Sequence, residues 1–264
     1  MRISVIGCGY LGAVHAAAMA QLGHEVIGID VDADKVAALT RGDAPFFEPG
    51  LPELLAEGVA SGRLRFSTDM SDAAGARVHF IAVGTPQVKG GNAADMTYVD
   101  AAITALLPHT DGDSVIVGKS TVPVGSAARL AELIREAGTG AVLAWNPEFL
   151  REGWAVKDSL EPDRLVLGLP PEEGSARVAE ATLRELYAPI IATGIPVVVT
   201  DFATAELVKV AANSLLATKI SFINAMAEIA EVTGADVTQL ADAIGHDARI
   251  GRRFLGAGIG FGGG

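Results

Sequence analysis

Near its N-terminus the chain carries the pattern Gly-Cys-Gly-Tyr-Leu-Gly, residues 7–12, between an apolar run and a helical pattern. The three glycines have distinct uses in such a turn. Gly7 permits a tight bend, Gly9 lets a pyrophosphate approach the backbone, and Gly12 allows the helix to pack closely on the strand. A second apolar run ends at Asp30, eighteen residues after Gly12. This arrangement predicts a dinucleotide-binding strand, helix and strand.

The cofactor that the turn predicts is NAD. A carboxylate at Asp30 can hydrogen-bond both ribose hydroxyls, and it repels the 2′-phosphate of NADP. Tyr10 and Leu11 belong to the same turn and are included among the expected cofactor contacts. Cys8 is expected to be a small packing residue there. A tight turn with no ligand is the alternative.

The rest of the first 200 residues alternates β-rich runs with alanine-rich helical patterns. This alternation predicts an α/β fold, a Rossmann-like doubly wound parallel sheet covered by helices on both faces. Helices are expected over 11–22 and, after a proline-rich turn, within 44–62. The expected strands are residues 2–7, 24–30, 78–84, 114–120, 141–146, 164–168 and 196–201.

From residue 201 the pattern becomes helical, which predicts two domains, an NAD-binding domain over 1–200 and a central helical domain over 201–264. One long helix is expected from Asp201, its N-cap, to Thr233, with Gly234 as the stop. A second helix is expected over 237–244. Apolar side chains recur along the long helix with a helical period, so we expect it to pair with a second copy in a homodimer.

Composition narrows the function classes. The formal net charge is −12, so no basic face is available to neutralise a nucleic-acid backbone, and no nucleic-acid partner is expected. Cys8 is the one cysteine, and the five histidines lack metal-ligand spacing, so neither a disulfide nor a metal site is expected. No segment has the length and apolarity of a membrane span, and residues 1–7 lack signal-peptide features, which predicts a cytoplasmic protein.

Two loops after predicted strands carry threonines at the edge where ligands bind. Open α/β sheets bind ligands at the carboxyl ends of their strands. Thr85, in Val-Gly-Thr-Pro, and Thr121, in Lys-Ser-Thr-Val-Pro-Val-Gly-Ser, can offer hydroxyls there. Ordinary turn chemistry explains threonine and proline at such positions equally well.

A third loop, residues 145–153, is richer in charge. It places Glu148, Arg151 and Glu152 directly after a predicted strand. Two carboxylates beside a cofactor can position water or bind hydroxyls, and a solvated charged loop is the alternative.

The long helix carries Lys209 and Asn213 four residues apart, so both lie on one helix face. A buried ammonium is costly without a partner or a function. Beside an alcohol that is being oxidised, a Lys–Asn pair can stabilise an oxyanion, whereas a surface lysine with a buried stem is the alternative.

Together these motifs resemble the UDP-glucose/GDP-mannose dehydrogenase family. The resemblance covers the whole chain in order: GCGYLG, Asp30, VGTP, KSTVPVG, NPEFLREG, ELVKVAANSLLATKISFINAMAEI and ARIGRRFLGAGIGFGGG. It implies an oxidoreductase that converts the C6 alcohol of a nucleotide sugar to a carboxylate with two NAD molecules, through a cysteine thiohemiacetal and thioester. STVPVG is more similar to the UDP-glucose branch, which implies UDP-glucose as substrate and UDP-glucuronate as product.

The resemblance also assigns roles to individual positions. The implied cofactor contacts beyond the turn are Asp30, Lys35, Thr85, Thr121 and Glu152. The implied catalytic residues are Thr121, Glu148 in thioester hydrolysis, and Lys209 and Asn213 as the oxyanion and water-positioning pair. The implied nucleotide-sugar contacts are Glu148, Phe149, Leu150, Arg151, Glu152, Lys209, Asn213, Phe254, Leu255, Gly256, Ala257, Gly258, Gly262 and, toward a partner subunit, Arg249.

One departure from the family pattern concerns the nucleophile. In the family, a cysteine and a further α/β domain follow the Gly-Phe-Gly-Gly motif, whereas this sequence stops at Gly264. We therefore expect an N-terminal portion that does not complete the oxidation. The alternatives are a β-hydroxyacid dehydrogenase, which residues 145–153 and the terminal glycines disfavour, and an NAD-binding module without catalysis.

Overall fold

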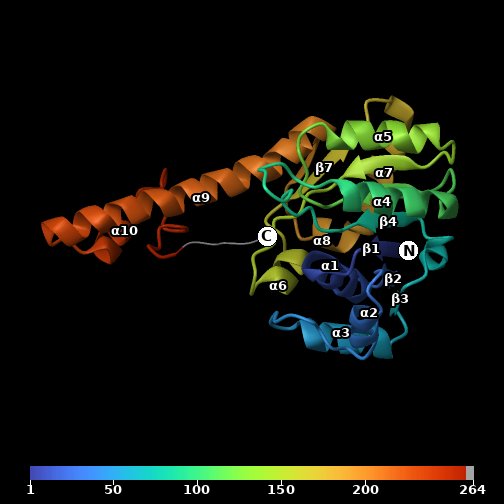
Figure 1. Ribbon diagram of the computed structural model, residues 1–264, viewed down its shortest axis with the longest axis horizontal. Coiled ribbons are helices and arrows are strands. Elements are labelled where there is room, and N and C mark those ends of the chain that lie inside the picture. The colour runs from blue at the N-terminus through green and yellow to red at the C-terminus, as the bar shows by residue number, and fades with distance from the viewer. Residues whose placement is uncertain (260–264) are drawn as a thin grey trace. The chain divides into compact units, whose positions relative to one another are not determined.

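The computed structural model describes residues 1–259, in which strands and helices alternate as predicted (Figure 1). The strands are β1 (Arg2–Ile6), β2 (Glu25–Ile29), β3 (Leu64–Ser67), β4 (Val78–Ile81), β5 (Val115–Gly118), β6 (Val142–Trp145), β7 (Leu165–Leu169) and β8 (Val197–Asp201). The α-helices are α1 (Tyr10–Gln21), α2 (Ala33–Thr40), α3 (Leu51–Ala60), α4 (Thr97–Leu106), α5 (Ser126–Glu136), α6 (Ala155–Leu160), α7 (Glu173–Leu186), α8 (Ala188–Ile191), α9 (Phe202–Thr233) and α10 (Val237–Gly245), with short 3-10 turns η1 (Met70–Ala73) and η2 (Leu107–His109).

The described strands form one sheet in the order β3-β2-β1-β4-β5-β6-β7-β8, so the predicted Rossmann-like fold class is confirmed. Strands β1 to β6 are parallel, with Ile3 of β1 level with Val26 and Val78 on its two neighbours. Strand β3 escaped the sequence patterns, because it is four residues long and only its first residue is buried.

The expectation of a wholly parallel sheet is wrong at one place. Strand β7 runs antiparallel to β6, where Trp145 pairs with Gly168, and β8 is then parallel to β7. A parallel neighbour needs a crossover that returns the chain to the opposite edge of the sheet. The connection from β6 to β7 contains α6, whose six residues rise only about 9 Å. Instead of crossing back, the chain re-enters the sheet from the edge it has just left.

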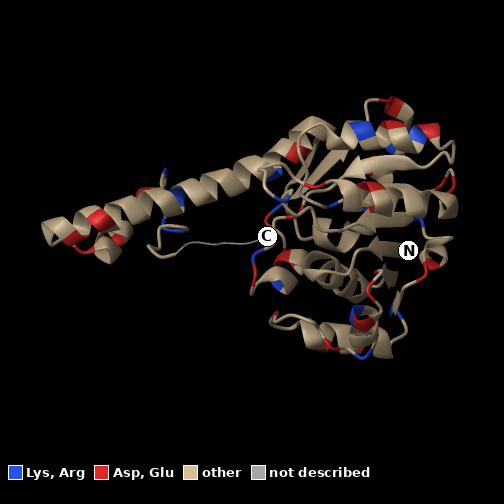
Figure 2. Cartoon of the chain, viewed as in Figure 1, with Lys and Arg blue, Asp and Glu red and all other residues tan. Residues whose placement is uncertain are grey.

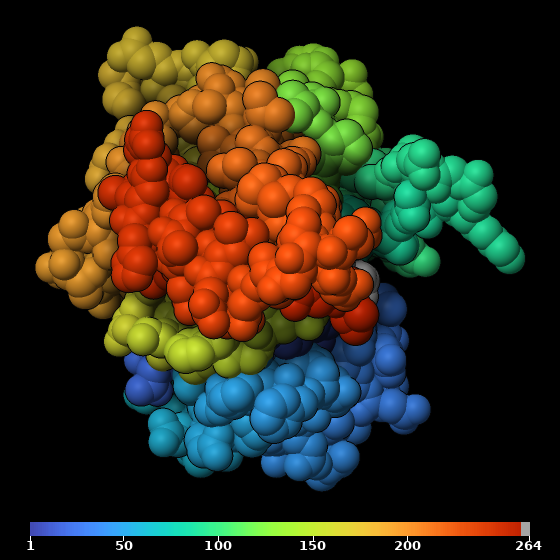
Figure 3. Space-filling model, turned by 90° about the vertical axis from the view of Figure 1, so that its left-hand side faces the viewer, coloured from blue at the N-terminus to red at the C-terminus, as the bar shows by residue number. Residues whose placement is uncertain are grey.

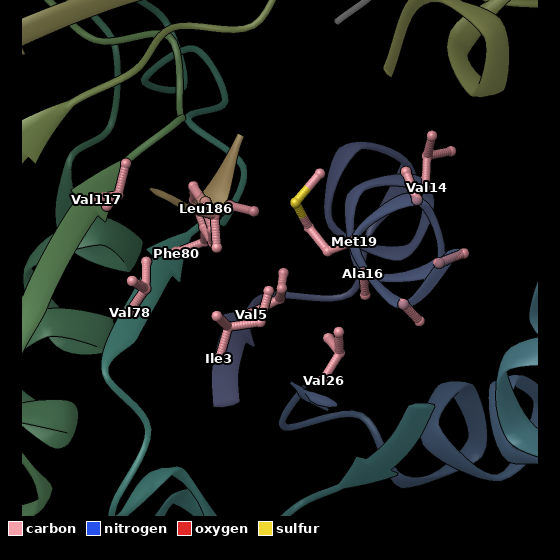
Figure 4. Close-up of a cluster of buried hydrophobic side chains, with 14 of the residues drawn as sticks. Ile3, Val5, Val14, Ala16, Met19, Val26, Val78, Phe80, Val117 and Leu186 are labelled. Atoms are coloured by element: carbon pink, nitrogen blue, oxygen red, sulfur yellow. The ribbon is translucent and has the colours of Figure 1, made fainter. Parts of the chain in front are cut away.

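Helix α1 packs against the centre of the sheet because its inner residues are small. Every residue from Gly12 to Ala20 is buried. Figure 4 shows Met19 and Ala16 on the side of this helix that faces the strands, near Val5 and Val26, and Val14 on the other side of the helix. The close approach of helix to sheet places the N-terminal end of α1 beside the carboxyl end of β1.

The flanking helices fall into two groups. Helix α1 contacts α3 and α6, and Figure 1 shows these three together, with α4 and α5 gathered apart from them. Right-handed crossovers that run in opposite directions from the centre of the sheet place their helices on opposite faces. The two groups therefore cover the two faces of the sheet, and the loops at the carboxyl ends of the strands stay accessible.

The chain divides into two compact units, one from Met1 to Leu207 and one that begins at Val208. Helix α9 begins in the first unit. Its predicted N-cap is confirmed, since Asp201 Oδ1 accepts a hydrogen bond of 2.8 Å from the Thr204 amide. In the second unit, a small core joins α9, α10 and the segment after α10, and its buried members are Ile223, Ala241 and Leu255.

Charged side chains are distributed over both units. Lysines and arginines lie interspersed with aspartates and glutamates in the view of Figure 2. Among the described residues, no helix is long and apolar enough to cross a membrane.

A buried histidine in the sheet predicts a loss of stability in mild acid. His79 lies in β4 with Nδ1 2.8 Å from Ser4 Oγ and Nε2 3.4 Å from Ser114 Oγ. Burial lowers the pKa of His79 from 6.5 to about 4. Between these values the unfolded chain binds a proton that the native chain does not bind. The stabilisation is therefore complete above pH 6.5 and falls as the pH decreases toward 4.

Urea unfolding between about pH 7 and pH 5 would measure this slope. We expect His79→Gln to flatten it by up to about 1.4 kcal/mol per pH unit, the value for one proton. His246→Gln, at an exposed position, is the control and should leave the slope unchanged. An unaltered slope in His79→Gln would contradict the assignment.

Candidate dinucleotide-binding and catalytic site

The three glycines of the first turn occupy three different environments. Gly7 has a φ of +89°, and a Cβ there would lie 2.7 Å from Val83 Cγ1. A Cβ on Gly12 would lie 1.7 Å from the carbonyl oxygen of Gly7, whereas one on Gly9 would meet no atom within 4 Å. Gly7 and Gly12 are thus required by the fold, and the space at Gly9 is open for a ligand.

Asp30 lies at the end of β2 and is 8% exposed. Its Oδ2 accepts from the Cys8 amide at 2.7 Å, and its Oδ1 accepts from the Asp32 amide at 3.0 Å. Lys35 Nζ completes the group at 3.0 Å from Oδ2. The predicted cofactor residues Asp30 and Lys35 therefore lie together, and Asp30 ties the glycine turn to the end of β2.

The loops after β4 and β5 are joined through the two predicted threonines. The hydroxyl of Thr85 donates to the carbonyl oxygen of Thr121 at 2.6 Å, and the hydroxyl of Ser120 donates to the carbonyl oxygen of Val83 at 2.7 Å. After Thr85 the chain forms a hairpin closed by the Gln87–Ala94 bridge. Figure 3 shows this segment, coloured teal, projecting from the first unit.

The loop after β6 is held by its own side chains rather than being freely solvated. Glu148 Oε2 accepts from the Leu150 amide at 2.7 Å. Arg151 forms a two-pronged pair with Asp158, at 2.9 and 2.5 Å, and the hydrogen bond to this carboxylate raises the pKa of Arg151. The guanidinium of Arg164 lies 3.9 Å from the centroid of the Phe149 ring. Glu152 is exposed.

Two buried glutamates hold backbone amides at this edge, and sequence reasoning missed both. Glu206, at the start of α9, is 2% exposed and accepts from the amides of Gly125 and Ala127 at 2.7 and 2.6 Å. Burial raises the pKa of Glu206, while the two amides lower it. Glu48, also 2% exposed, accepts from the amides of Gly153 and Ala155, both at 2.8 Å.

A further polar group beneath the same edge was also missed. Lys119 is 8% exposed, and its Nζ donates to Asn146 Oδ1 at 3.1 Å. The buried hydroxyl of Tyr187 donates to the same oxygen at 2.7 Å. Buried hydrogen bonds to Asn146 therefore join the loops after β5 and β6. The residues next to Lys119 and Asn146 in the sequence gave no signal for the contact, because the two lie 27 residues apart.

In the second unit, α9 carries the predicted pair. Lys209 is 6% exposed, and Asn213 is exposed one turn later. Lys219 Nζ donates to the carbonyl oxygen of Ile250 at 2.9 Å and secures the following segment to α9.

The predicted sugar contacts of that segment lie in different surroundings. Arg249 is exposed and paired with Asp247, and Phe254 holds a φ of +63°, a conformation that costs of order 1 kcal/mol or more in a bulky residue. The side chain of Leu255 belongs to the small core, Gly256 and Ala257 are exposed, and Gly258 exchanges hydrogen bonds with Asn224. Gly262 lies outside the described residues. No cluster of metal-ligating side chains occurs among residues 1–259.

Comparison with known families gives two matches that together span nearly the whole chain. Residues 1–191 match the NAD binding domain of the UDP-glucose/GDP-mannose dehydrogenase family. Residues 203–264 match the central domain of the same family.

Individual relatives agree with these matches. A UDP-glucose 6-dehydrogenase from Rhizobium meliloti is 46% identical over 266 aligned residues, which cover 100% of this chain and 60% of the relative. The structure of a UDP-glucose dehydrogenase from Pyrobaculum islandicum has a TM-score of 0.91 and 41% identity, covering 99% of this chain and 60% of that one. A GDP-mannose dehydrogenase from Pseudomonas aeruginosa has a TM-score of 0.87 and 33% identity, covering 100% and 61%. The chain thus spans about three fifths of the length of these relatives.

We predict opposite effects for substitutions of Gly9 and Gly12, the second and third glycines of the turn. Gly9→Ala should leave stability unchanged, because the new methyl meets no atom within 4 Å, but should weaken NAD binding by at least about tenfold, because the methyl occupies the approach of the pyrophosphate. Gly12→Ala should destabilise the first unit by about 1–3 kcal/mol. Urea unfolding and titration calorimetry check both outcomes. Equal NAD affinity in Gly9→Ala, or equal stability in Gly12→Ala, would contradict these assignments.

Proposed function

The chain belongs to the UDP-glucose/GDP-mannose dehydrogenase family, and we propose that it serves the NAD-dependent oxidation of a nucleotide sugar. In the proposed reaction the C6 alcohol of UDP-glucose becomes the carboxylate of UDP-glucuronate. The observation that carries the proposal is the match to both family domains along residues 1–191 and 203–264. It includes the dinucleotide turn and the helix that bears Lys209.

The first turn fits the cofactor. The open space at Gly9 admits a pyrophosphate, and the amides of the first turn of α1 are available to it because no side chain caps this helix. We assign the carboxylate of Asp30, with Lys35 beside it, to the ribose hydroxyls. NAD, when bound, takes up the hydride that leaves the sugar carbon.

Four residues are proposed as catalytic: Thr121, Glu148, Lys209 and Asn213. Thr121 is exposed in the loop after β5, at the carboxyl edge of the sheet where the glycine turn also lies. Glu148 supports water in the hydrolysis that completes the oxidation. The buried ammonium of Lys209 stabilises negative charge on the substrate oxygen, and the Asn213 amide positions a water molecule. The proposed sugar contacts are residues 148–152, Arg249, residues 254–258 and Gly262.

The covalent route needs a thiolate, and Cys8 does not fit that role. Cys8 is fully buried beneath the turn, with Sγ 3.9 Å from the carbonyl oxygen of Val5. Burial and the nearby carboxylate of Asp30 raise its pKa well above the usual value, which keeps the thiol protonated. Cys8 is a packing residue of the turn in this proposal.

Calorimetry and a product assay test the proposed function together. The 264-residue chain should bind NAD more tightly than NADP, because the Asp30 carboxylate repels a 2′-phosphate. Without a reactive thiol it should form no UDP-glucuronate from UDP-glucose and NAD. A chain that binds no NAD, or that turns over small β-hydroxyacids, would overturn the proposal.

We also propose that α9 forms a homodimer. Three of its exposed apolar residues, Leu215, Phe222 and Ile229, are 63%, 48% and 54% exposed. They recur every seven residues, so they lie along one side of the helix. An exposed apolar stripe of this length favours burial against an identical stripe on a second copy.

The predicted cytoplasmic location stays a prediction.

Sedimentation of the chain and two variants tests the dimer. Phe222→Glu should shift the chain toward monomer, because a charge in the paired stripe would lose its hydration. Ser221→Glu places the same charge at the neighbouring exposed position, on another side of the helix, and should leave the dimer intact. A wild-type chain that sediments as a monomer would contradict this proposal.

A further inference from the structure

The glutamate that precedes α3 links two parts of the site that lie far apart in the sequence. Glu48 is 2% exposed, and three donors surround its carboxylate. The hydroxyl of Tyr10 donates to Oε2, the amide of Gly153 donates to the same oxygen at 2.8 Å, and the amide of Ala155 donates to Oε1 at 2.8 Å. The partners lie 38, 105 and 107 residues away.

One end of this link is the glycine turn. Tyr10 follows Gly9 directly and is the first residue of α1, where the backbone would contact a bound pyrophosphate. Its ring packs on Phe46 with centroids 5.0 Å apart, so the ring and the segment that carries Glu48 are held together. Burial and the bond to Glu48 raise the pKa of Tyr10 above its usual value. The phenol therefore keeps its proton and acts as the donor.

The other end is the loop after β6. Gly153 follows directly on residues 148–152, which hold the predicted sugar contacts, and Ala155 is the first residue of α6. Within that stretch Glu148 is folded back on the Leu150 amide, and Arg151 is fixed to Asp158. A displacement at Gly153 is therefore transmitted to the whole loop rather than absorbed in it.

The chemistry of the link requires a carboxylate. All three surrounding groups are donors, and an ionised carboxyl group offers only acceptors. Hydrogen bonds to an ionised acceptor are shorter and stronger than neutral ones. A glutamine would present its NH₂ group to at least one of the donors, so it loses a bond without changing the size of the side chain.

From this geometry we propose that Glu48 is a positioning residue that couples cofactor occupancy of the glycine turn to the order of the loop at residues 148–155. The inference rests on the proposed NAD binding. A cofactor on the turn restrains the first residue of α1, Tyr10 transmits the restraint to Glu48, and Glu48 holds the amides of Gly153 and Ala155. The loop is thereby ordered for the sugar when the cofactor is in place.

Amide hydrogen exchange of the full 264-residue chain, with and without NAD, tests the coupling. In the wild type, NAD should slow exchange at Gly153 and Ala155 by about tenfold, which is within the usual range of coupling between sites. Tyr10→Phe removes the donor and keeps the ring. Calorimetry on this variant sets the NAD concentration that saturates it, and at saturation it should lose most of the protection at these two amides. Tyr98→Phe, an exposed tyrosine on α4, is the matched control and should behave as the wild type.

Glu48→Gln provides the second variant. It should speed exchange at Gly153 and Ala155 even without NAD, whereas Glu53→Gln, exposed on α3, should not. The coupling is overturned if NAD binds the wild type without protecting these amides, or if Tyr10→Phe keeps the full protection. Absence of NAD binding to the wild type would instead remove the proposed function, and the coupling with it. A faster exchange in ligand-free Glu48→Gln would still report the link itself.

Discussion

The loops that form this site depend on buried carboxylates that accept hydrogen bonds from backbone amides. Asp30 holds the amides of Cys8 and Asp32, Glu48 holds those of Gly153 and Ala155, and Glu206 holds those of Gly125 and Ala127. Buried amides without partners are costly, and buried charges are costly without donors. Each pairing removes both costs. Three loops at the carboxyl edge are thereby fixed without further secondary structure.

The same pairing decides where an anion can bind to an acidic protein. Carboxylates already occupy the amides around the starts of α5 and α6, through Glu206 and Glu48. Helix α1 begins at Tyr10, and Gly9 at its N-cap position provides no side-chain cap. A helix N-terminus with free amides attracts a phosphate even in a chain with net charge −12, because the attraction is local. The turn at Gly9 is therefore the favoured phosphate position among these three.

The accuracy of the sequence predictions follows the range of the interactions involved. The glycine turn, Asp30 and every described strand except β3 were predicted because their signals are local and lie within about thirty residues. The same reasoning located Thr85, Thr121 and Glu148 at strand ends, since a parallel sheet collects those ends at one edge. It failed for the direction of β7, because periodicity reports that a strand exists and not which way it enters the sheet.

The buried acids show the limit of local signals most clearly. Asp30 was found because it ends the second strand at a fixed distance along the chain from the glycine fingerprint. Glu48 and Glu206 are more deeply buried than Asp30, but the backbone amides that they hold lie 79 to 107 residues away, and nothing in their own neighbourhoods distinguishes them from solvated glutamates. From sequence alone, Glu48 beside Pro49 is interpreted as a turn residue, and Glu206 on a helix is interpreted as a solvent-exposed surface residue. What separates such residues from ordinary surface charges is the set of donors that the fold brings to them, so their roles become visible only in three dimensions.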